Sequence, residues 1–326
     1  MGATIVEEAR PLVKMLVWST LYRPAIGVIT GKRMRPEAAN TISVILPTTA
    51  TAARLRSLNR AIESVLSQQD VTVDLIVVAN GPRCDPEILD SLAKRLDVRL
   101  VYAEEGNYPA ALRLGRDLVE APFFAEIDDD DELLPMALAT RLRHLELDPS
   151  IDVVVTNGIL RRGGRDTIGI EDIDSCRTDP LRRLMDDMWL VPCAALYRTE
   201  TVTPDFFEAI PPAMEWTYLG TLLSLKRKIV FVDTPTFVYN RDTSDSLSRS
   251  KYYFLNTPDA MKRLMELELP AEIRELVREK HVRSLHAASN LELIEGNVSA
   301  AWKWHLRTLA HPSGWRYLTY TRHLVR

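Results

Sequence analysis

The sequence is poor in cysteine and glycine, and it carries no excess of positive charge. Its 326 residues include 3 cysteines and 13 glycines, and 41 Lys and Arg face 45 Asp and Glu for a formal charge of −4. Cys84, Cys176 and Cys193 lie far apart without a CxxC pair, which argues against structural zinc and favours a reducing compartment. A chain without net positive charge supplies no field for holding nucleic acid, so we expect no nucleic-acid partner.

Long apolar runs are also missing. Residues 12–29 come nearest to one, but Lys14 and Arg23 interrupt them, and a membrane span needs about 20 apolar residues. We therefore expect residues 1–40 to form an N-terminal helical or surface segment. The composition, 46% hydrophobic and 26% charged, is typical of a soluble globular protein. We expect a cytoplasmic location.

From residue 41 onward, short apolar runs alternate with amphipathic stretches. This alternation is typical of an α/β fold with a parallel sheet. It predicts strands at 42–46, 74–79, 98–103, 123–127, 153–157, 191–197 and 229–239, and helices at 54–68, 86–96 and 109–120. A mostly helical region follows, with helices at 273–294 and 298–309. Functional loops are expected beyond the carboxyl ends of the strands.

The strongest chemical signal is the run of acids from Asp128 to Glu132, directly after the apolar strand at 123–127. Adjacent carboxylates repel one another, and a hard divalent cation such as Mg²⁺ or Mn²⁺ makes such a cluster tolerable. A solvated acidic loop is the alternative interpretation. Asp131 and Glu132 also suit the N-terminus of the helix expected after them.

The order of several segments resembles the family 2 glycosyltransferases of the A-type fold. The segments are SVILPTT, SVLSQQ, IVVANGP, AALRLG, FAEIDDDDELLP and MEWTYLGTLLSLKRKIVFVDTPTFVYNRD, and the resemblance runs from residue 42 to about residue 248. The resemblance implies a Rossmann-like α/β fold with a mostly parallel central sheet. It also implies an inverting, metal-dependent enzyme that uses a sugar nucleotide with Mn²⁺ or Mg²⁺.

The resemblance assigns roles to the acidic run and to the end of the last strand. Asp128-Asp129-Asp130 matches the family's D-x-D motif, which implies that Asp128 and Asp129 contact the nucleotide sugar and that Asp130 ligates the metal. Arg241 and Asp242 stand where the family often has a basic residue and a histidine. Arg241 would then pair with the diphosphate and Asp242 would ligate the metal; a solvated loop is the alternative.

Further nucleotide-sugar contacts are implied near the first strands. Pro47, Thr48 and Thr49 match the family's nucleotide-approach loop, although turn chemistry would also explain the threonines. Asn80 replaces the acid that usually ends the second strand, and its amide oxygen suits the imide N–H of uracil or thymine. A simple turn at Asn80 is the alternative. Arg113 in AALRLG could reach the phosphates, or it could be an ordinary surface arginine.

The family's catalytic base comes from a Glu-Asp pair before the last strand, and Glu215-Trp216 occupies that place here. Glu215 is therefore the candidate base for a one-step displacement. A glutamate that merely favours the positive end of a helix is the alternative. Trp216 is a candidate for stacking on the sugar or the acceptor.

We expect a catalytic domain at 41–250, with a nucleotide-binding half at 41–131 and an acceptor half at 132–250, and a helical extension at 251–326. The extension ends in a basic, aromatic tail: residues 301–326 hold five Lys or Arg and no acid. Such a tail could dock peripherally on an anionic membrane, or its aromatics could pack on the catalytic domain.

The expected activity is that of a hexosyltransferase in cell-surface polysaccharide synthesis. It would move a sugar from a UDP- or dTDP-sugar to a hydroxyl of a glycan or lipid-linked acceptor. A catalytically inactive binding module of the same fold is one alternative. A sugar-nucleotide nucleotidyltransferase is another, although PTTATAARL stands where a Gly-rich basic phosphate loop would be needed.

Overall fold

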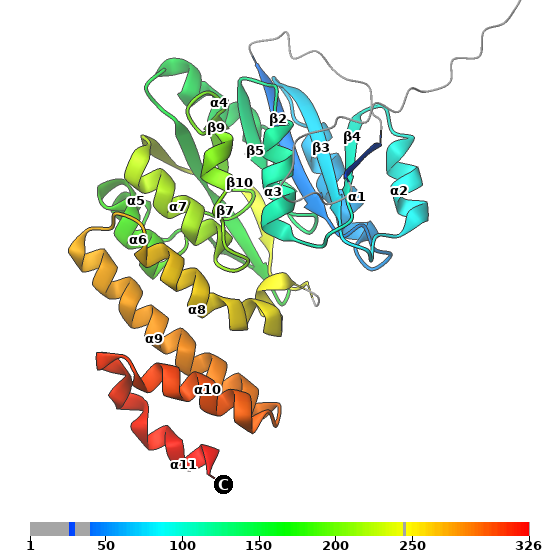
Figure 1. Ribbon diagram of the computed structural model, residues 1–326. Helices are drawn as coiled ribbons and strands as arrows, with labels where there is room; N and C mark the ends of the chain where they lie inside the picture. The colour runs from blue at the N-terminus through cyan, green and yellow to red at the C-terminus, as the bar shows by residue number, and fades with distance from the viewer. Residues whose placement is uncertain (1–25, 30–39, 244–245, 326) are drawn as a thin grey trace, which may run out of the picture.

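The computed structural model describes residues 26–29, 40–243 and 246–325, and within them a ten-stranded sheet forms the frame of the molecule (Figure 1). Its order is β1-β4-β3-β2-β5-β9-β7-β10-β6, with β8 paired to β7. The strands are β1 (Ile26–Ile29), β2 (Thr41–Thr48), β3 (Thr72–Asn80), β4 (Val98–Ala103), β5 (Phe123–Glu126), β6 (Glu132–Leu133), β7 (Val153–Arg162), β8 (Arg165–Ile168), β9 (Ala195–Arg198) and β10 (Ile229–Asn240).

The strands between residues 41 and 131 include a run of parallel neighbours. The strands β4, β3, β2 and β5 run parallel to one another, as do β7 and β10, and β9 joins the two groups antiparallel. Ile45 pairs with Ile76 on one side and with Glu126 on the other. The carboxyl ends of β2, β3 and β5 therefore reach the same edge of the sheet. The expected α/β fold with a mostly parallel central sheet is confirmed.

Helices connect the strands and pack on the sheet. Those of the α/β part are α1 (Leu55–Leu66), α2 (Pro86–Ala93), α3 (Tyr108–Asp117), α4 (Ala137–Leu147), α5 (Ile173–Thr178), α6 (Pro180–Asp186) and α7 (Glu215–Lys226), with the 3-10 turn η1 (Pro204–Phe207). In α1 the buried positions Leu58, Ile62 and Val65 share one face, as the helical spacing predicts. The α7 helix differs, because every residue from Glu215 to Leu223 is buried.

The helical extension expected at the C-terminus is present. It comprises η2 (Leu247–Arg249), α8 (Lys251–Met265), α9 (Ala271–Ile294), α10 (Val298–Leu309), η3 (Pro312–Tyr320) and α11 (Thr321–Leu324). These helices stack away from the sheet, with α8 and α9 next to α6 and α7 and with α10 and α11 at the far end (Figure 1). No helix in the described part of the chain has both the length and the apolar character needed to cross a bilayer.

The N-terminal segment departs from the expectation where it is described. Residues 26–29 form β1, which pairs antiparallel with β4, whereas a helical or surface segment was expected over 1–40. The helical prediction is wrong for these four residues, because the edge of β4 offers backbone groups that a strand satisfies. The remainder of the segment, residues 1–25 and 30–39, lies outside the described residues.

The close packing of α3 on β2 yields a stability test at Gly115. A Cβ at Gly115 would lie 2.3 Å from Cγ2 of Ile45. Alanine in a helix gains about 1 kcal/mol over glycine, but overpacking costs about 1–3 kcal/mol. We expect Gly115→Ala to lower the free energy of unfolding in urea. Asp117→Ala on the exposed side of α3 is the control and should change it little. A Gly115→Ala protein as stable as wild type would contradict this packing.

Candidate active site

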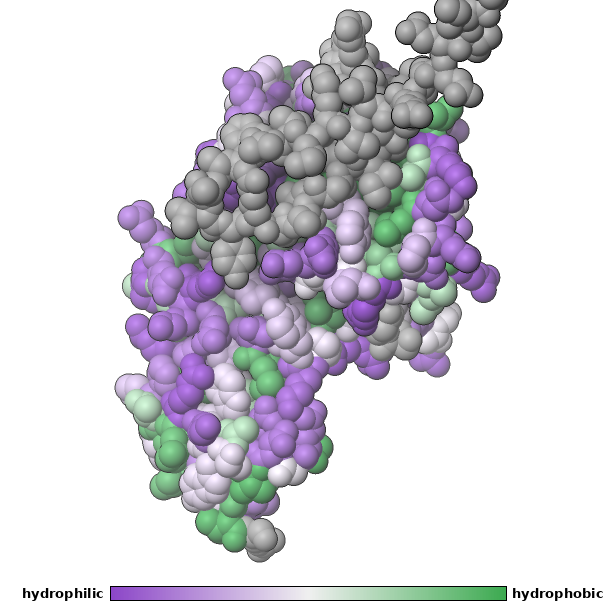
Figure 2. Space-filling model, turned by 45° about the vertical axis from the view of Figure 1, so that its right-hand side comes forward, coloured by the Kyte–Doolittle hydropathy of each residue, from purple (hydrophilic) through white to green (hydrophobic). Residues whose placement is uncertain are grey.

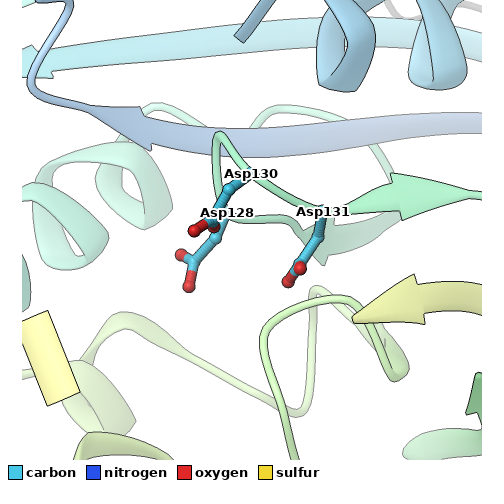
Figure 3. Close-up of side chains that lie close together, drawn as sticks. All are labelled: Asp128, Asp130 and Asp131. Atoms are coloured by element: carbon cyan, nitrogen blue, oxygen red, sulfur yellow. The ribbon is translucent and has the colours of Figure 1, made fainter. Parts of the chain in front are cut away.

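The acidic turn after β5 gathers three carboxylates. One oxygen from each of Asp128, Asp130 and Asp131 lies within 4.8 Å of the others, and the three side chains leave the same turn (Figure 3). Glu132 does not join them, because its carboxylate lies 3.0 Å from the guanidinium of Arg60 on α1. The expected cluster is thus a group of three. Its all-oxygen donor set fits a hard divalent cation such as Mg²⁺ or Mn²⁺.

Asp129 ties the acidic turn to the end of β2. The hydroxyl of Thr48 donates to Oδ2 of Asp129 at 2.5 Å, and the guanidinium of Arg54 donates to Oδ1 at 2.8 Å. Arg54 also lies 3.1 Å from a carboxylate oxygen of Asp130. The carboxylate of Asp129 is therefore bonded within the protein, although the resemblance gave it a contact with the nucleotide sugar.

Asp131 ties the same turn to the end of β10. Its side chain is buried, and its two oxygens accept from the backbone N–H of Asn240 at 2.8 Å and from the thiol of Cys193 at 3.5 Å. The side-chain amide of Asn240 also donates to the backbone carbonyl of Asp130 at 2.6 Å. These bonds hold the turn between β5 and β10.

Asp128 receives a hydrogen bond from the hydroxyl of Tyr108 at 2.6 Å. Burial and the negative charge of Asp130 raise the pKa of Asp128 well above its usual range. Burial and the charges of Asp130 and Asp128 do the same to the pKa of Asp131. The pKa shifts of Asp128 and Asp131 reflect burial and mutual repulsion, and a bound divalent ion would relieve this repulsion.

The end of β3 lies at the same edge of the sheet as the end of β2. The amide of Asn80 donates to the backbone carbonyl of Thr48 at 3.1 Å, so the ends of β2 and β3 are joined. The hydroxyl of Thr48 also accepts from the N–H of Ala50, whose φ of 43° lies in the left-handed region. Pro47 belongs to the buried β2, and Thr49 follows that strand half-buried. The predicted nucleotide loop and Asn80 are thus brought together with the acidic turn.

Glu215 begins α7, and Met214 before it has a φ of 59°. Its side chain is 4% exposed, and its Oε1 has no hydrogen-bond partner among the described residues. Burial raises the pKa of Glu215 from 4.5 to about 7. Burial, followed by the charges of Asp128 and Glu215, raises the pKa of Tyr108, so the hydroxyl that donates to Asp128 also interacts with the charge of Glu215. One oxygen of the Glu215 carboxylate, which has no partner in the part of the chain that is described, can accept a proton.

Four other predicted residues contact groups other than the three aspartates. Arg113 pairs with Asp117 and with Glu208, on the side of α3 that faces η1. Both oxygens of Asp242 accept from the backbone N–H of Gly163 in the β7–β8 turn, so Asp242 does not join the three aspartates.

Arg241 is exposed after β10, and its backbone N–H donates to Arg161. Trp216 is 7% exposed and belongs to the hydrophobic core, which leaves little of its ring for stacking on a sugar.

Sequence reasoning missed the residues that support the aspartates. Tyr108 stands just before the AALRLG segment, Arg54 begins the helix after the first strand, and Asn240 lies within the quoted FVYNRD. Their proximity to recognised segments was a usable signal. Their contacts depend on long-range packing between α3, α1, β10 and the turn, which spacing along the chain does not reveal.

Comparisons with known proteins agree with this geometry. Residues 43–202 match the family described as Glycosyl transferase family 2. A comparison with curated proteins finds no match. Among solved structures, S. aureus TarS 1-349 in complex with UDP-GlcNAc has a TM-score of 0.51 at 15% identity, covering 77% of this chain and 72% of TarS. A second structure of TarS 1-349 has the same TM-score and identity, with 77% and 71% covered. This likeness shows a shared fold.

The geometry of the turn predicts which acid matters for metal binding. Asp130→Asn keeps the size of the side chain but removes a charged ligand, and we expect it to weaken Mn²⁺ binding by at least roughly 10-fold in isothermal titration calorimetry. Glu132→Gln, which alters the neighbouring acid paired with Arg60, is the matched control and should bind like wild type. Equal losses in the two variants would contradict a site built on Asp130.

The burial of Glu215 predicts a pH-dependent stability cost. Because its folded pKa is about 7 and its usual value is 4.5, the folded state binds the proton more tightly, and stability falls as pH rises from about 4.5 to 7. Glu215→Gln should therefore unfold with a free energy about 2–3 kcal/mol higher than wild type at pH 8. At pH 4 the two proteins should be nearly equal. Urea unfolding at both pH values measures this, and a difference independent of pH would refute it.

Proposed function

Residues 43–202 of this chain form a glycosyl transferase family 2 domain, and on that premise we propose that it transfers a sugar from a nucleotide diphosphate sugar to an acceptor hydroxyl, with inversion at the anomeric carbon. One observation carries the proposal: three mutually close aspartates lie at the strand edge that also holds Thr48 and Asn80. The buried Glu215, with one carboxylate oxygen left without a partner in the described structure, is the candidate base. These groups supply a place for a diphosphate and a base.

A divalent ion fits the acidic turn, and Mn²⁺ or Mg²⁺ is proposed. Asp130 and Asp128 would hold it, with Asp131 behind them. When bound, such an ion neutralises the charge that develops on the departing diphosphate. Arg54 fixes the orientation of Asp130 and Asp129, and Tyr108 fixes that of Asp128. The protein thus orders the carboxylates before substrate arrives, which lowers the reorganisation needed during reaction.

Glu215 is proposed to act as the general base. Its carboxylate would accept the proton of the acceptor hydroxyl while the hydroxyl oxygen bonds to the anomeric carbon and the bond to the nucleoside diphosphate breaks. Attack opposite the leaving group inverts the anomeric centre. A pKa of about 7 suits this role, because the carboxylate is then a strong enough base and still largely ionised at slightly alkaline pH.

A UDP- or dTDP-sugar is the proposed donor. Because the amide N–H of Asn80 is bonded to Thr48, its carbonyl oxygen remains to accept the imide N–H that uracil and thymine share. Asp128 and the half-buried Thr49 would contact the nucleotide, and the exposed Arg241 would supply a cation for the diphosphate. The S. aureus TarS structure with the same fold was determined with UDP-GlcNAc, which supports a uridine donor by analogy.

A glycan or lipid-linked acceptor in cell-surface polysaccharide synthesis is proposed. Apolar side chains gather at the lower end of the molecule in Figure 2, where the C-terminal extension lies. Trp315, Leu318 and Val325 are 74%, 58% and 71% exposed there, among the cations of a stretch without acids. This composition favours peripheral contact with an anionic membrane on its cytoplasmic face, where a lipid-linked acceptor would lie.

Donor hydrolysis tests the proposal without a known acceptor, because water can replace the hydroxyl. The full chain is incubated with UDP-, dTDP- and GDP-sugars, with Mn²⁺, Mg²⁺ or chelator, and free nucleoside diphosphate is measured. We expect metal-dependent release from a UDP- or dTDP-sugar, rising with pH around a midpoint near 7 as Glu215 loses its proton. Glu215→Gln should lower the rate by roughly 10²–10⁴-fold.

The Glu132→Gln variant again serves as a control, since its side chain faces Arg60, and it should release the diphosphate at the wild-type rate. A wild-type protein that releases nothing from any donor, and that binds no nucleotide in the presence of metal, would refute the proposed activity.

A further inference from the structure

An apolar cavity of about 360 Å³ opens where the start of α7 meets α8 and α9. Met214 contributes to it from the residue before α7, Tyr253 and Phe254 from α8, and Ala287 from α9. Phe254 is 48% exposed, so the cavity can be reached from solvent. The cavity belongs to the junction between the start of α7 and the helical extension.

Each of the three hydroxyl groups around the cavity makes a hydrogen bond within the protein. The hydroxyl of Tyr253 accepts from the backbone N–H of Met214 at 2.9 Å. The hydroxyl of Thr257 donates to the carbonyl of Tyr253 at 2.9 Å, and that of Ser284 donates to the carbonyl of His281 at 2.7 Å. Each hydroxyl has capacity for a further hydrogen bond, but three hydroxyls among apolar side chains offer few partners to a sugar ring with its many hydroxyls. An aliphatic chain needs none, so the lining favours a hydrocarbon.

One charged side chain, Arg283, joins the described lining of the cavity. Its guanidinium is 61% exposed and lies 3.7 Å from the carboxylate of Glu279, a loose contact at the surface. A cation at the mouth of an apolar cavity complements an anion attached to a hydrocarbon chain. A phosphate ester meets this requirement, because guanidinium binds phosphate oxygens with matching geometry.

The cavity is adjacent to the proposed base. Met214 lines the cavity and immediately precedes Glu215 in the chain. The Tyr253 hydroxyl is bonded to the backbone N–H of Met214, next to Glu215 in the chain, and burial, followed by the charge of Glu215, raises the pKa of Tyr253 to about 12. A molecule whose hydrocarbon lies in the cavity would have its other end close to Glu215.

We propose that this cavity is an acceptor subsite that takes the hydrocarbon of a lipid-linked acceptor, with Arg283 binding the phosphate that joins the lipid to the rest of the acceptor. The inference rests on the proposed function and narrows its acceptor to an alkyl phosphate conjugate. Met214, Tyr253 and Phe254 contact the chain. The cavity then selects lipid-linked over free glycan acceptors, because a free glycan leaves it unfilled.

The test uses n-octyl phosphate, below the concentration at which it forms micelles, titrated into the full chain in a calorimeter. Each buried CH₂ of the octyl chain gives about a fourfold gain in binding. Ala287→Trp is designed to fill the cavity and exclude this chain, so we expect the affinity for octyl phosphate to fall by roughly 10-fold or more. Arg283→Gln should weaken the binding of octyl phosphate by roughly 3- to 5-fold and leave the affinity for 1-octanol unchanged. Inorganic phosphate should not bind measurably.

Matched controls lie on the same helix. Arg278→Gln removes an arginine that, like Arg283, pairs with a glutamate of α9. Ala271→Trp adds a tryptophan, as Ala287→Trp does, but at the start of that helix. Both should bind octyl phosphate like wild type. Circular dichroism melts check that Ala287→Trp is folded, and Arg283→Gln tests the site without adding bulk.

Three outcomes would overturn the proposal: no binding of octyl phosphate to wild type, equal binding to folded Ala287→Trp, or equal losses in Arg283→Gln and Arg278→Gln. Nucleoside diphosphate release by the wild-type chain is measured separately. If release is absent while octyl phosphate binds as expected, the transferase proposal fails and the cavity remains a site for alkyl phosphates. If release occurs while the binding pattern fails, only the acceptor subsite is wrong.

Discussion

Repulsion between neighbouring carboxylates is the constraint on which the rest of the site depends. Four consecutive aspartates follow β5, and the fold separates them by giving them different partners. Asp129 is bonded to Thr48 and Arg54 at one strand end, and Asp131 to Asn240 at another. The same bonds that lower the repulsion fasten the turn to β2 and β10. The acidic turn is therefore a junction of the fold as well as a candidate ligand set.

The remaining repulsion costs stability and would favour the binding of a cation. Asp128 and Asp130 stay close together, and the pKa of Asp128 is raised by burial and by its neighbour. Glu215 carries a similar cost, since its buried Oε1 lacks a hydrogen bond. Proteins tolerate such unfavourable groups chiefly where function uses them. Two costly features near one another support an active site better than either does alone.

The sequence predicted the sheet well because buried parallel strands read as continuous apolar runs. The strand expected at 98–103 is β4 with the same limits, and those at 42–46 and 229–239 differ from β2 and β10 by at most two residues at either end. Boundaries were poorer where tertiary pairing decides: β1 was expected as part of a helix and exists as a partner of β4. The acidic turn was also predicted, since five adjacent acids after a strand are a strong local signal.

Side-chain contacts across the fold were harder to predict. Trp216 was a candidate for stacking on a sugar. Because every residue of α7 from Glu215 to Leu223 is buried, the sequence of this helix has no polar face that would indicate which side chains face solvent. Arg113 is paired with Asp117, a contact that its i,i+4 spacing could have suggested. Tyr108 and Asn240 reach the turn only through packing of distant elements, which no local pattern encodes.

The central claim is that the acidic turn holds a divalent ion against a nucleotide diphosphate. A crystal grown with Mn²⁺ and UDP tests it directly, because anomalous scattering locates manganese independently of the protein. The account predicts one strong anomalous peak bonded to a carboxylate oxygen of Asp130, with the diphosphate on its open side and Asn80 near the base. A nucleotide bound with no manganese at the turn, or manganese held elsewhere, would contradict it.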